Sequence, residues 1–367
     1  MATVTQAAVL ERLRAVEDPE LHRSIVDLGM VKEVVIRDGR VRIDVRLTVQ
    51  GCPLTQKIER EVKDAVGALD GVDGAGAVDV DLGVMTPDEL RQVGAKVRGT
   101  AGEAAAPPPS PFAKGDLATR VLIVASGKGG VGKSTVAANL GAALAARGQS
   151  VGLLDADIYG FSIPRLVGLS EGPRVITDGV IIPPEAAGMK VMSMGSLVEE
   201  RQPVIWRGPM LSKLLAQFLG EVQWGEPDYL VVDSPPGTGD VAISLQGQLP
   251  GGGIVLVTTP QELAVSVAAR VSAMAARTGQ RVLGVVENMA YLVCPHCGET
   301  TQIFAGDGGE RLAAELGVPL LARLPILPAL SRAGDEGRPA ALAAPGSPAA
   351  VAFQDLAERV AALAWAR

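Results

Sequence analysis

The feature that most constrains the fold is a glycine-rich loop between a predicted strand and a predicted helix. Residues 121–125 form a short apolar run, and an alanine-rich helical stretch extends to Ala146. Between them the chain reads Gly127-Lys128-Gly129-Gly130-Val131-Gly132-Lys133-Ser134-Thr135. The glycines let successive backbone N–H groups turn toward a phosphate, and the helix N-terminus adds positive potential. The pattern G-x-x-x-x-G-K-S in this context therefore predicts a nucleotide-binding loop.

The side chains of this loop suit ATP and Mg²⁺. We expect every residue from Gly127 to Thr135 to contact the nucleotide, with Lys133 reaching the β- and γ-phosphates and Ser134 ligating Mg²⁺. Lys128 is an addition to the minimal pattern. The simpler alternatives are a glycine turn that caps an ordinary helix and a solvated lysine at position 128.

Aspartates follow two of the other predicted strands. Residues 151–154 lead into Asp155 and Asp157, and residues 229–232 lead into Asp233. The carboxyl ends of parallel strands meet at one edge of the sheet, where the phosphates and Mg²⁺ would lie. We expect Asp155 and Asp233 to lie near the magnesium ion and Asp157 to orient the attacking water. The alternative is that these aspartates only cap helices or turns.

The apolar runs predict an α/β fold. They are bounded by Gly, Pro or Asp, alternate with segments of helical character, and cover residues 121–125, 151–154, 229–232, 254–257 and 282–286. Strands that are apolar throughout and separated by helices predict a mostly parallel sheet that is covered by helices on both faces.

A second, smaller domain precedes this sheet. Its predicted elements are helices over residues 5–15 and 54–69 and strands over residues 31–36, 41–47 and 78–82. These short elements make a small α+β domain. Residues 104–111 are rich in Pro and Ala, which favours the extended geometry of a semi-rigid linker. We therefore predict an α+β domain at 1–97, a linker at 98–116 and an ATP-binding domain at 117–367.

Composition excludes several classes of function. The chain has 367 residues, and 34 Lys+Arg against 41 Asp+Glu give a net charge of -7. This balance argues against a broad grip on nucleic acid or anionic lipid. No apolar run approaches the ~18 residues that span a bilayer, the N-terminus has no export signal, and three cysteines are too few for a disulfide framework. We expect a cytoplasmic protein with no membrane or nucleic-acid partner.

Two of the cysteines are spaced like metal ligands, in Cys294-Pro295-His296-Cys297-Gly298. Such a pair can chelate a metal, exchange disulfides or consist of two buried thiols. Disulfide exchange needs the first thiol at a helix N-terminus, which Gly298 disfavours. Zinc or a cubane iron–sulfur cluster normally takes four protein ligands. Cys294 and Cys297 therefore predict half of a metal site, which a two-fold dimer would complete.

Together these motifs resemble the Mrp/ApbC family of iron–sulfur cluster carrier ATPases, which are P-loop NTPases similar to MinD and ParA. Besides the phosphate loop, the resemblance rests on Leu154-Asp155-Ala156-Asp157-Ile158-Tyr159-Gly160, Trp206-Arg207-Gly208-Pro209-Met210, Asp233-Ser234-Pro235-Pro236-Gly237-Thr238-Gly239-Asp240 and Asn288-Met289 with the cysteine pair. It implies a homodimer in which Lys128 reaches the partner's nucleotide and Asn288 lies near the base. Lys128, Lys133 and Asp157 are then the expected catalytic residues.

The same resemblance implies a cargo and partners. In the family, the paired cysteines of two protomers hold a [4Fe-4S] cluster, and ATP binding or hydrolysis is tied to its loading or delivery. We therefore expect recipient apo iron–sulfur proteins and cluster-assembly proteins as partners.

The N-terminal domain resembles the SufT-like domain that precedes the ATPase in many members of this family. The resemblance rests on Asp18-Pro19-Glu20, Ile25-Val26-Asp27-Leu28-Gly29-Met30-Val31 and Gly51-Cys52-Pro53-Leu54. It implies a role in cluster assembly or target contact. Cys52 precedes a proline and a predicted helix. Two interpretations remain open: it contacts iron transiently, or it is a buried cysteine that caps the helix.

Two other functions remain open from the sequence. A positioning ATPase of the MinD or ParA kind needs a basic amphipathic tail or a basic surface. Residues 353–367 are amphipathic but carry no cationic excess, so we expect a helix packed on the ATPase. A zinc-bridged nucleotide switch is the second alternative, because thiolates suit both metals.

Overall fold

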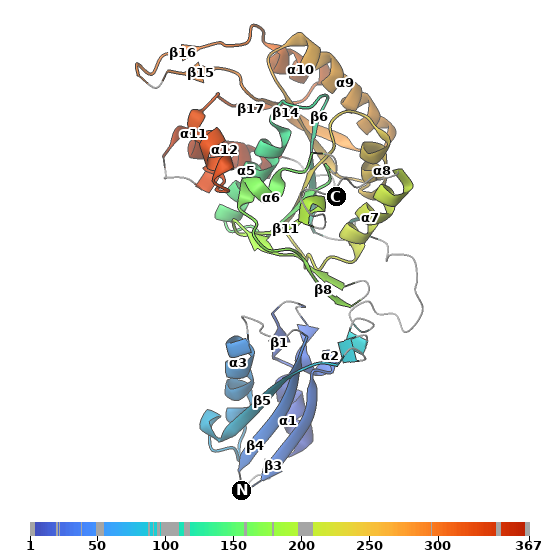
Figure 1. The fold of residues 1–367 in the computed structure, drawn as a ribbon, viewed down its shortest axis with the longest axis vertical. Coiled ribbons are helices and arrows are strands. Elements are labelled where there is room, and N and C mark those ends of the chain that lie inside the picture. The colour runs from blue at the N-terminus through green and yellow to red at the C-terminus, as the bar shows by residue number, and fades with distance from the viewer. Residues whose placement is uncertain are drawn as a thin grey trace. The chain divides into compact units, whose positions relative to one another are not determined.

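The computed structural model describes residues 4–19, 21, 23–37, 39–48, 55–86, 89–90, 92–93, 96, 110–113, 118–157, 160–177, 180–196, 208–294, 296–342 and 346–363. The chain divides into two compact units (Figure 1). The first combines Met1–Ala106, Arg174–Ile182 and Glu221–Gly225, and the second combines Pro107–Pro173, Pro183–Gly220 and Glu226–Arg367. Two short segments of the predicted ATP-binding domain are therefore grouped with the N-terminal unit. Most of the predicted linker lies outside the described residues.

The first unit is a three-stranded sheet with helices packed on one face. Its elements are α1 (Gln6–Leu13), β1 (Glu17–Asp18), β2 (Arg23–Ser24), α2 (Ile25–Leu28), β3 (Val31–Arg37), β4 (Arg40–Leu47), α3 (Thr55–Gly67), η1 (Ala75–Ala77), β5 (Val78–Val84), β8 (Arg174–Thr177) and β9 (Val180–Ile182). The sheet order is β3-β4-β5, with β3 antiparallel and β5 parallel to β4. Alternate residues of β4 are buried, and they share a core with Ile58, Val62 and Val66, which lie one turn apart on α3. The predicted helices and strands of this region are confirmed.

The second unit contains an eight-stranded sheet in the order β10-β11-β7-β12-β6-β13-β14-β17. Its strands are β6 (Arg120–Ser126), β7 (Val151–Asp155), β10 (Glu185–Ala186), β11 (Met189–Ser193), β12 (Tyr229–Asp233), β13 (Gly253–Thr258), β14 (Arg281–Glu287) and β17 (Leu320–Arg323). All neighbouring pairs are parallel except β10 with β11 at the edge. A hairpin of β15 (Leu292–Val293) and β16 (Thr300–Thr301) projects beyond the β14–β17 side of this sheet (Figure 1).

Helices cover both faces of this sheet (Figure 1). They are α5 (Lys133–Ala146), α6 (Ile163–Val167), α7 (Gly208–Gly220), α8 (Asp240–Gln248), α9 (Glu262–Arg277), α10 (Gly308–Leu316), α11 (Pro328–Asp335) and α12 (Pro348–Ala361), with the short turns η2 (Pro111–Ala113), η3 (Met194–Ser196) and η4 (Ala340–Leu342). The helix α5 is buried nearly all round, between the sheet and α12. The predicted α/β fold with a mostly parallel sheet is therefore confirmed.

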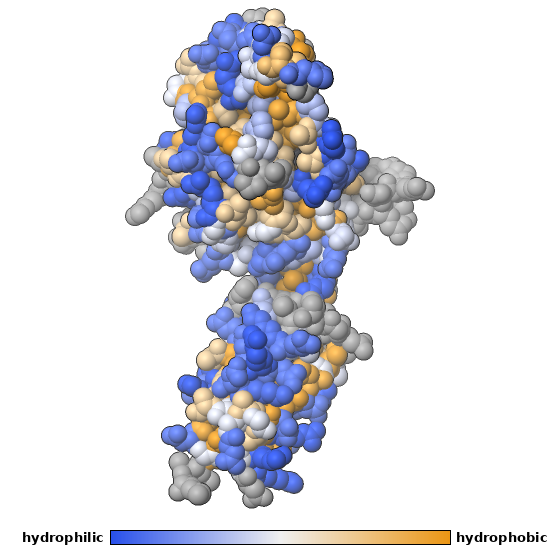
Figure 2. All heavy atoms as spheres, turned by 90° about the vertical axis from the view of Figure 1, so that its left-hand side faces the viewer, coloured by the Kyte–Doolittle hydropathy of each residue, from blue (hydrophilic) through white to orange (hydrophobic). Residues whose placement is uncertain are grey.

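The C-terminal helix completes the core of this unit. Phe353, Leu356 and Val360 of α12 are fully or almost fully buried and belong to the same apolar cluster as α5. The expected C-terminal helix is confirmed for the described residues, and it packs on the second unit. Among the described residues, no helix is both long and apolar enough to cross a membrane. On the face drawn in Figure 2, hydrophobic and hydrophilic residues are interspersed over both units.

Candidate functional site

The phosphate loop connects β6 to α5. Gly130 and Gly132 both have φ of 82°, a left-handed conformation that favours glycine. Gly132 is the N-cap of α5, and no side chain caps this helix. The first N–H groups of α5 are therefore available to an anionic ligand. A Cβ added to Gly132 would clash with Nδ2 of Asn288, so the loop backbone packs directly against that side chain.

Lys133 places a buried positive charge between two aspartates. Its Nζ lies 2.5 Å from Oδ1 of Asp233 and 3.5 Å from Oδ2 of Asp157, and it donates to Oγ of Ser134 at 3.3 Å. The structure thus brings together four residues that the sequence predicted for catalysis and magnesium binding. In this arrangement the carboxylates neutralise the lysine, which offsets the cost of burying its charge.

Asp233 has the chemistry of a magnesium-site residue. It lies at the end of β12, and burial raises the pKa of its carboxyl group, although nearby Lys133 opposes that rise. Its Oδ2 is buried, and none of the described residues gives it a hydrogen bond. Ser134 supplies a hydroxyl group within hydrogen-bonding reach of Asp233. Carboxylate and hydroxyl oxygens are the ligands that Mg²⁺ prefers, so the residues present fit this ion.

Asp155 stabilises the segment that follows β7 through hydrogen bonds. The strand register places it beside Asp233, and its carboxylate accepts from Ser193 Oγ at 2.9 Å and from the backbone N–H groups of Asp157 at 3.1 Å and Ile163 at 3.4 Å. Both of its oxygens are therefore engaged by protein groups. Burial, and secondarily the negative charge of Asp233, raise the pKa of Asp155 to about 7.

This raised pKa predicts how stability depends on pH. The folded pKa of Asp155 is about 7 against an ordinary 3.8, so the folded chain binds the proton more tightly between these values. In the protein without nucleotide or Mg²⁺, we expect the free energy of unfolding to fall as pH rises from about 4 to about 7. The total fall should be a few kcal/mol, since one pKa unit corresponds to about 1.4 kcal/mol. The pKa of Asp233 is shifted in the same direction and adds to the fall.

Denaturant unfolding at pH 5.5 and 7.5 measures this dependence, with Asp155→Asn as the matched variant. The asparagine cannot titrate, so its stability should change less with pH than that of the wild type. An equal pH dependence in both proteins would show that Asp155 does not titrate in this range.

The other predicted nucleotide residues lie around the same loop. Lys128 Nζ donates to Oε1 of Gln261 at 3.4 Å, so its side chain contacts the start of α9. Asn288 is buried, and its Nδ2 donates to the carbonyl oxygen of Val131 at 2.9 Å. Thr135 lies in the first turn of α5. Asn288 therefore joins the end of β14 to the phosphate loop.

The cysteine pair lies at the tip of the β15–β16 hairpin. Cys294 directly follows β15, its N–H donates to the carbonyl of Glu299, and its carbonyl accepts from Gly298, whose φ is 76°. Hydrogen bonds from the backbone N–H groups of Cys297 and His296, and from the Cys297 thiol, lower the pKa of the Cys294 thiol. Cys294 is half-buried, whereas Cys297 and His296 are exposed. The pair is thus held on a tight turn, and the lowered pKa favours the thiolate form of Cys294.

The described residues contain no group of three or more His, Cys, Asp and Glu side chains placed to hold a metal ion. In this part of the chain the cysteine pair therefore offers two candidate metal ligands and no third beside them. Cys52 and Pro295 lie outside the described residues, as do Ile158, Tyr159, Trp206 and Arg207.

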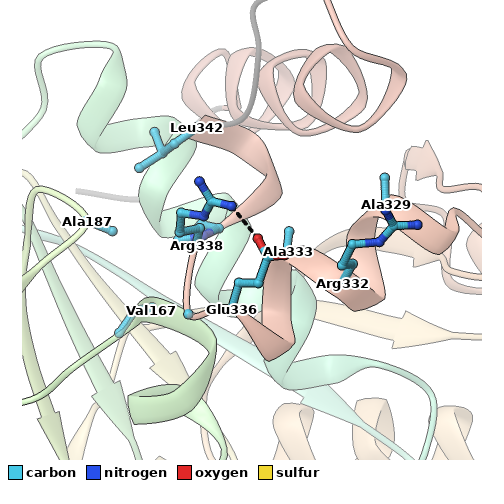
Figure 3. Close-up of a pocket in the computed structure, with 10 residues that line it drawn as sticks. Val167, Ala187, Ala329, Arg332, Ala333, Glu336, Arg338 and Leu342 are labelled. Carbon is cyan, nitrogen blue, oxygen red and sulfur yellow. Dashed lines mark hydrogen bonds and ion pairs between the residues drawn. The ribbon is translucent and has the colours of Figure 1, made fainter.

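A separate cavity of about 700 Å³ lies between α6, α11 and η4 (Figure 3). Its described lining is largely apolar, with Arg338 paired to Glu336 at its edge. None of the described residues that line it belongs to the predicted nucleotide, magnesium or cysteine sites. Four residues of the predicted sites therefore meet at the phosphate loop rather than in this cavity.

The sequence did not predict two of the residues that hold the site in place. Ser193 reaches Asp155 from β11, and Gln261 contacts Lys128 from the start of α9. Neither belongs to a motif of its own. Only the adjacency of β11 to β7 in the sheet, and of β13 to β6, brings these residues to the phosphate loop.

In this parallel sheet, β6 leads through a glycine loop to a buried lysine, and carboxylates end β12, which lies beside β6, and β7, which lies beside β12. This arrangement defines a P-loop NTPase. Residues 118–361 match the family model described as "NUBPL iron-transfer P-loop NTPase", and residues 6–81 match the model described as "Iron-sulfur cluster assembly protein". The chain therefore belongs to the family of iron-transfer P-loop NTPases, which confirms the resemblance found in the sequence.

Relatives and solved structures agree with this membership. A Mycobacterium tuberculosis protein named "Iron-sulfur cluster carrier protein" is 47% identical over 349 residues, which cover 93% of this chain and 89% of that protein. A nucleotide-binding protein from Archaeoglobus fulgidus, solved in complex with ADP, is 40% identical with a TM-score of 0.53, and the match covers 60% of this chain and 87% of that one. The cell division ATPase MinD of Pyrococcus furiosus is 25% identical with a TM-score of 0.50, covering 66% and 98%.

Proposed function

We propose that this chain is a cytoplasmic, ATP-hydrolysing carrier that holds a [4Fe-4S] cluster across a homodimer and transfers it to apoproteins. The observation that carries the proposal is the cysteine hairpin on a P-loop NTPase. Cys294 has a lowered thiol pKa, and Cys297 is exposed at the same turn. A positioning ATPase that binds no metal would not need such a turn.

Lys133 has two alternative sets of partners in the proposed ATPase cycle. It pairs with Asp233 and Asp157 here, and it would exchange these partners for the β- and γ-phosphates when ATP binds. That exchange would free Asp233, together with Ser134, to hold a Mg²⁺ ion, and would free Asp157 to orient the attacking water. A bound Mg²⁺ ion would stabilise the charge that develops on the phosphates. Asp155 would stay close to the metal and fix the position of the Asp157 segment.

Lys128 and Asn288 would complete the nucleotide site. The Lys128–Gln261 contact is long at 3.4 Å, so little is lost when the lysine extends toward the nucleotide of a second copy. Asn288 would face the nucleotide base beside Val131. The Lys128 assignment requires a dimer that closes around its nucleotides.

The same dimer would complete the cluster site. A cubane cluster takes four thiolates, and Cys294 and Cys297 of one chain supply two of them. A two-fold axis between the two hairpins would bring the second pair opposite the first. We propose that recipient apo iron–sulfur proteins and cluster-assembly proteins contact this dimer, the latter through the N-terminal domain.

Cluster transfer tests this function. Protein reconstituted with iron and sulfide without oxygen is mixed with a metal-free [4Fe-4S] dehydratase, and the activity of the dehydratase is followed with and without MgATP. We expect activation by the loaded protein and none by the metal-free protein. Failure to activate the acceptor at any nucleotide condition would contradict the carrier function, and stoichiometric zinc would favour the zinc-bridged switch. Nucleotide-dependent binding to vesicles or DNA would favour the positioning ATPase.

A further inference from the structure

Glu287 and Arg323 form an ion pair between the phosphate loop and the cysteine hairpin. Glu287 ends β14 and its side chain is 0% exposed, while Arg323 ends β17 and its side chain is 40% exposed. The Nε of Arg323 donates to Oε2 of Glu287 at 2.8 Å, and the N–H of Gly309 donates to Oε1 at 2.8 Å. The buried carboxylate is thus fully engaged, and it fixes the inner edge of the guanidinium group.

The inner side of this pair adjoins the nucleotide site. The residue after Glu287 is Asn288, whose side chain holds the Val131 carbonyl of the phosphate loop. Space between Asn288 and the loop is minimal, because a Cβ added to Gly132 would clash with the Asn288 amide. Asn288, the chain neighbour of Glu287, is therefore in direct contact with any change in the position of the loop.

The outer side of the pair adjoins the base of the hairpin. Arg323 lines a recess of about 250 Å³ together with Tyr291, Thr300, Thr301 and Gln302, which lie in or beside β15 and β16. Backbone hydrogen bonds join the same two segments. The N–H of Ala290 donates to the carbonyl of Leu324, and the N–H of Ile326 donates to the carbonyl of Tyr291. The guanidinium group of Arg323 therefore binds the end of β14 on one side. On its other side it borders the cysteine hairpin.

Met289 provides a place where this connection can bend. It lies between Asn288 and the hairpin, and it is a non-glycine residue with φ of 56°. A side chain in this left-handed region stores local strain. Such a residue between two fixed segments is suited to change conformation when one of the segments moves.

We propose that Glu287 and Arg323 are positioning residues that transmit nucleotide occupancy from the phosphate loop to the cysteine hairpin. Nucleotide binding shifts Asn288, the ion pair carries the shift to β17 and the recess, and the accessibility of Cys294 and Cys297 changes. The inference rests on the proposed function for its biological meaning, namely that ATP controls the hold on the cluster.

Cysteine alkylation in metal-free protein tests this connection. The rates at Cys294 and Cys297 are measured by peptide mass spectrometry with and without MgADP, in the wild type and in Arg323→Gln. We expect MgADP to change the wild-type rate at least about fivefold, the lower end of typical coupling between sites. In Arg323→Gln the ratio of the alkylation rates with and without MgADP should be about one, while the affinity for MgADP stays near that of the wild type.

Arg359→Gln is the matched control, because this arginine also binds β17, through the carbonyl of Leu321, and in the described part of the chain it forms no hydrogen bond or ion pair with Glu287. It should keep the wild-type ratio. The double variant Glu287→Gln with Arg323→Gln leaves no unpaired buried charge, so it replaces Arg323→Gln if the single variant fails to fold.

Three results would overturn the inference: a wild-type ratio of one, a ratio in Arg323→Gln equal to that of the wild type, or an equal loss in Arg359→Gln. The readout uses protein without a cluster, so it stays interpretable if the carrier function fails. Conversely, a wild type that carries a cluster but shows no response to MgADP would contradict this inference alone.

Discussion

Changing Cys294 or Cys297 to serine should remove nearly all bound iron from protein reconstituted with iron and sulfide. A hydroxyl group at either position is a poor ligand for iron in such a cluster, and each change removes two of four ligands from a two-fold dimer. We expect about four iron and four sulfide per wild-type dimer, and close to zero in either variant. Metal analysis and the visible spectrum measure the effect.

The third cysteine of the chain provides the control. Cys52→Ser is expected to keep the full iron content, because the proposed cluster rests on the hairpin pair alone. The hairpin variants should also form weaker dimers in the metal-loaded state, which sedimentation measures. Full iron retention in both hairpin variants would refute the proposed site.

Lys133→Ala should lower the rate of ATP hydrolysis by at least about 100-fold. The variant loses the charge that would stabilise the transferred phosphate, and removal of one such preorganised donor costs about 100- to 1,000-fold in other enzymes. It also leaves Asp233 without its 2.5 Å partner, which should raise the pKa of that carboxyl group further. Phosphate release at saturating MgATP measures the loss.

Lys213→Ala is the matched control for this variant. Lys213 is an exposed lysine on α7, outside the phosphate loop, so its loss should change the rate by less than about twofold. Circular dichroism should show the same fold for both variants. Hydrolysis at the wild-type rate in Lys133→Ala would mean that the site is placed wrongly.

The sequence predicts the strands of the sheet that are apolar throughout. The strands β6, β7, β12, β13 and β14 each stand out as short runs between Gly, Pro or Asp. Two further parallel strands, β11 and β17, escape this pattern. The first contains Lys190, whose pKa is lowered by burial, and the second is short and ends in the charged Arg323. A charged residue within a short run hides the strand from any hydrophobicity pattern.

The residues of the candidate site also divide into those that the sequence predicts and those that it does not. Lys133, Asp157 and Asp233 are predictable because motif spacing places them at the carboxyl edge of a parallel sheet. Ser193, Glu287 and Arg323 are not, since their roles come from which strands are neighbours and which side chains are buried together. The two-residue strands of the cysteine hairpin are also too short to give a periodic signal, although the Cys-x-x-Cys spacing marks the turn.

The most direct test of the central claim is the metal content of the wild-type protein purified without oxygen. Iron, acid-labile sulfide and zinc are measured per dimer, before and after reconstitution. A cluster bridged by the two hairpins predicts about four iron and four sulfide per dimer, with little zinc. Stoichiometric zinc that no cluster replaces on reconstitution would contradict it.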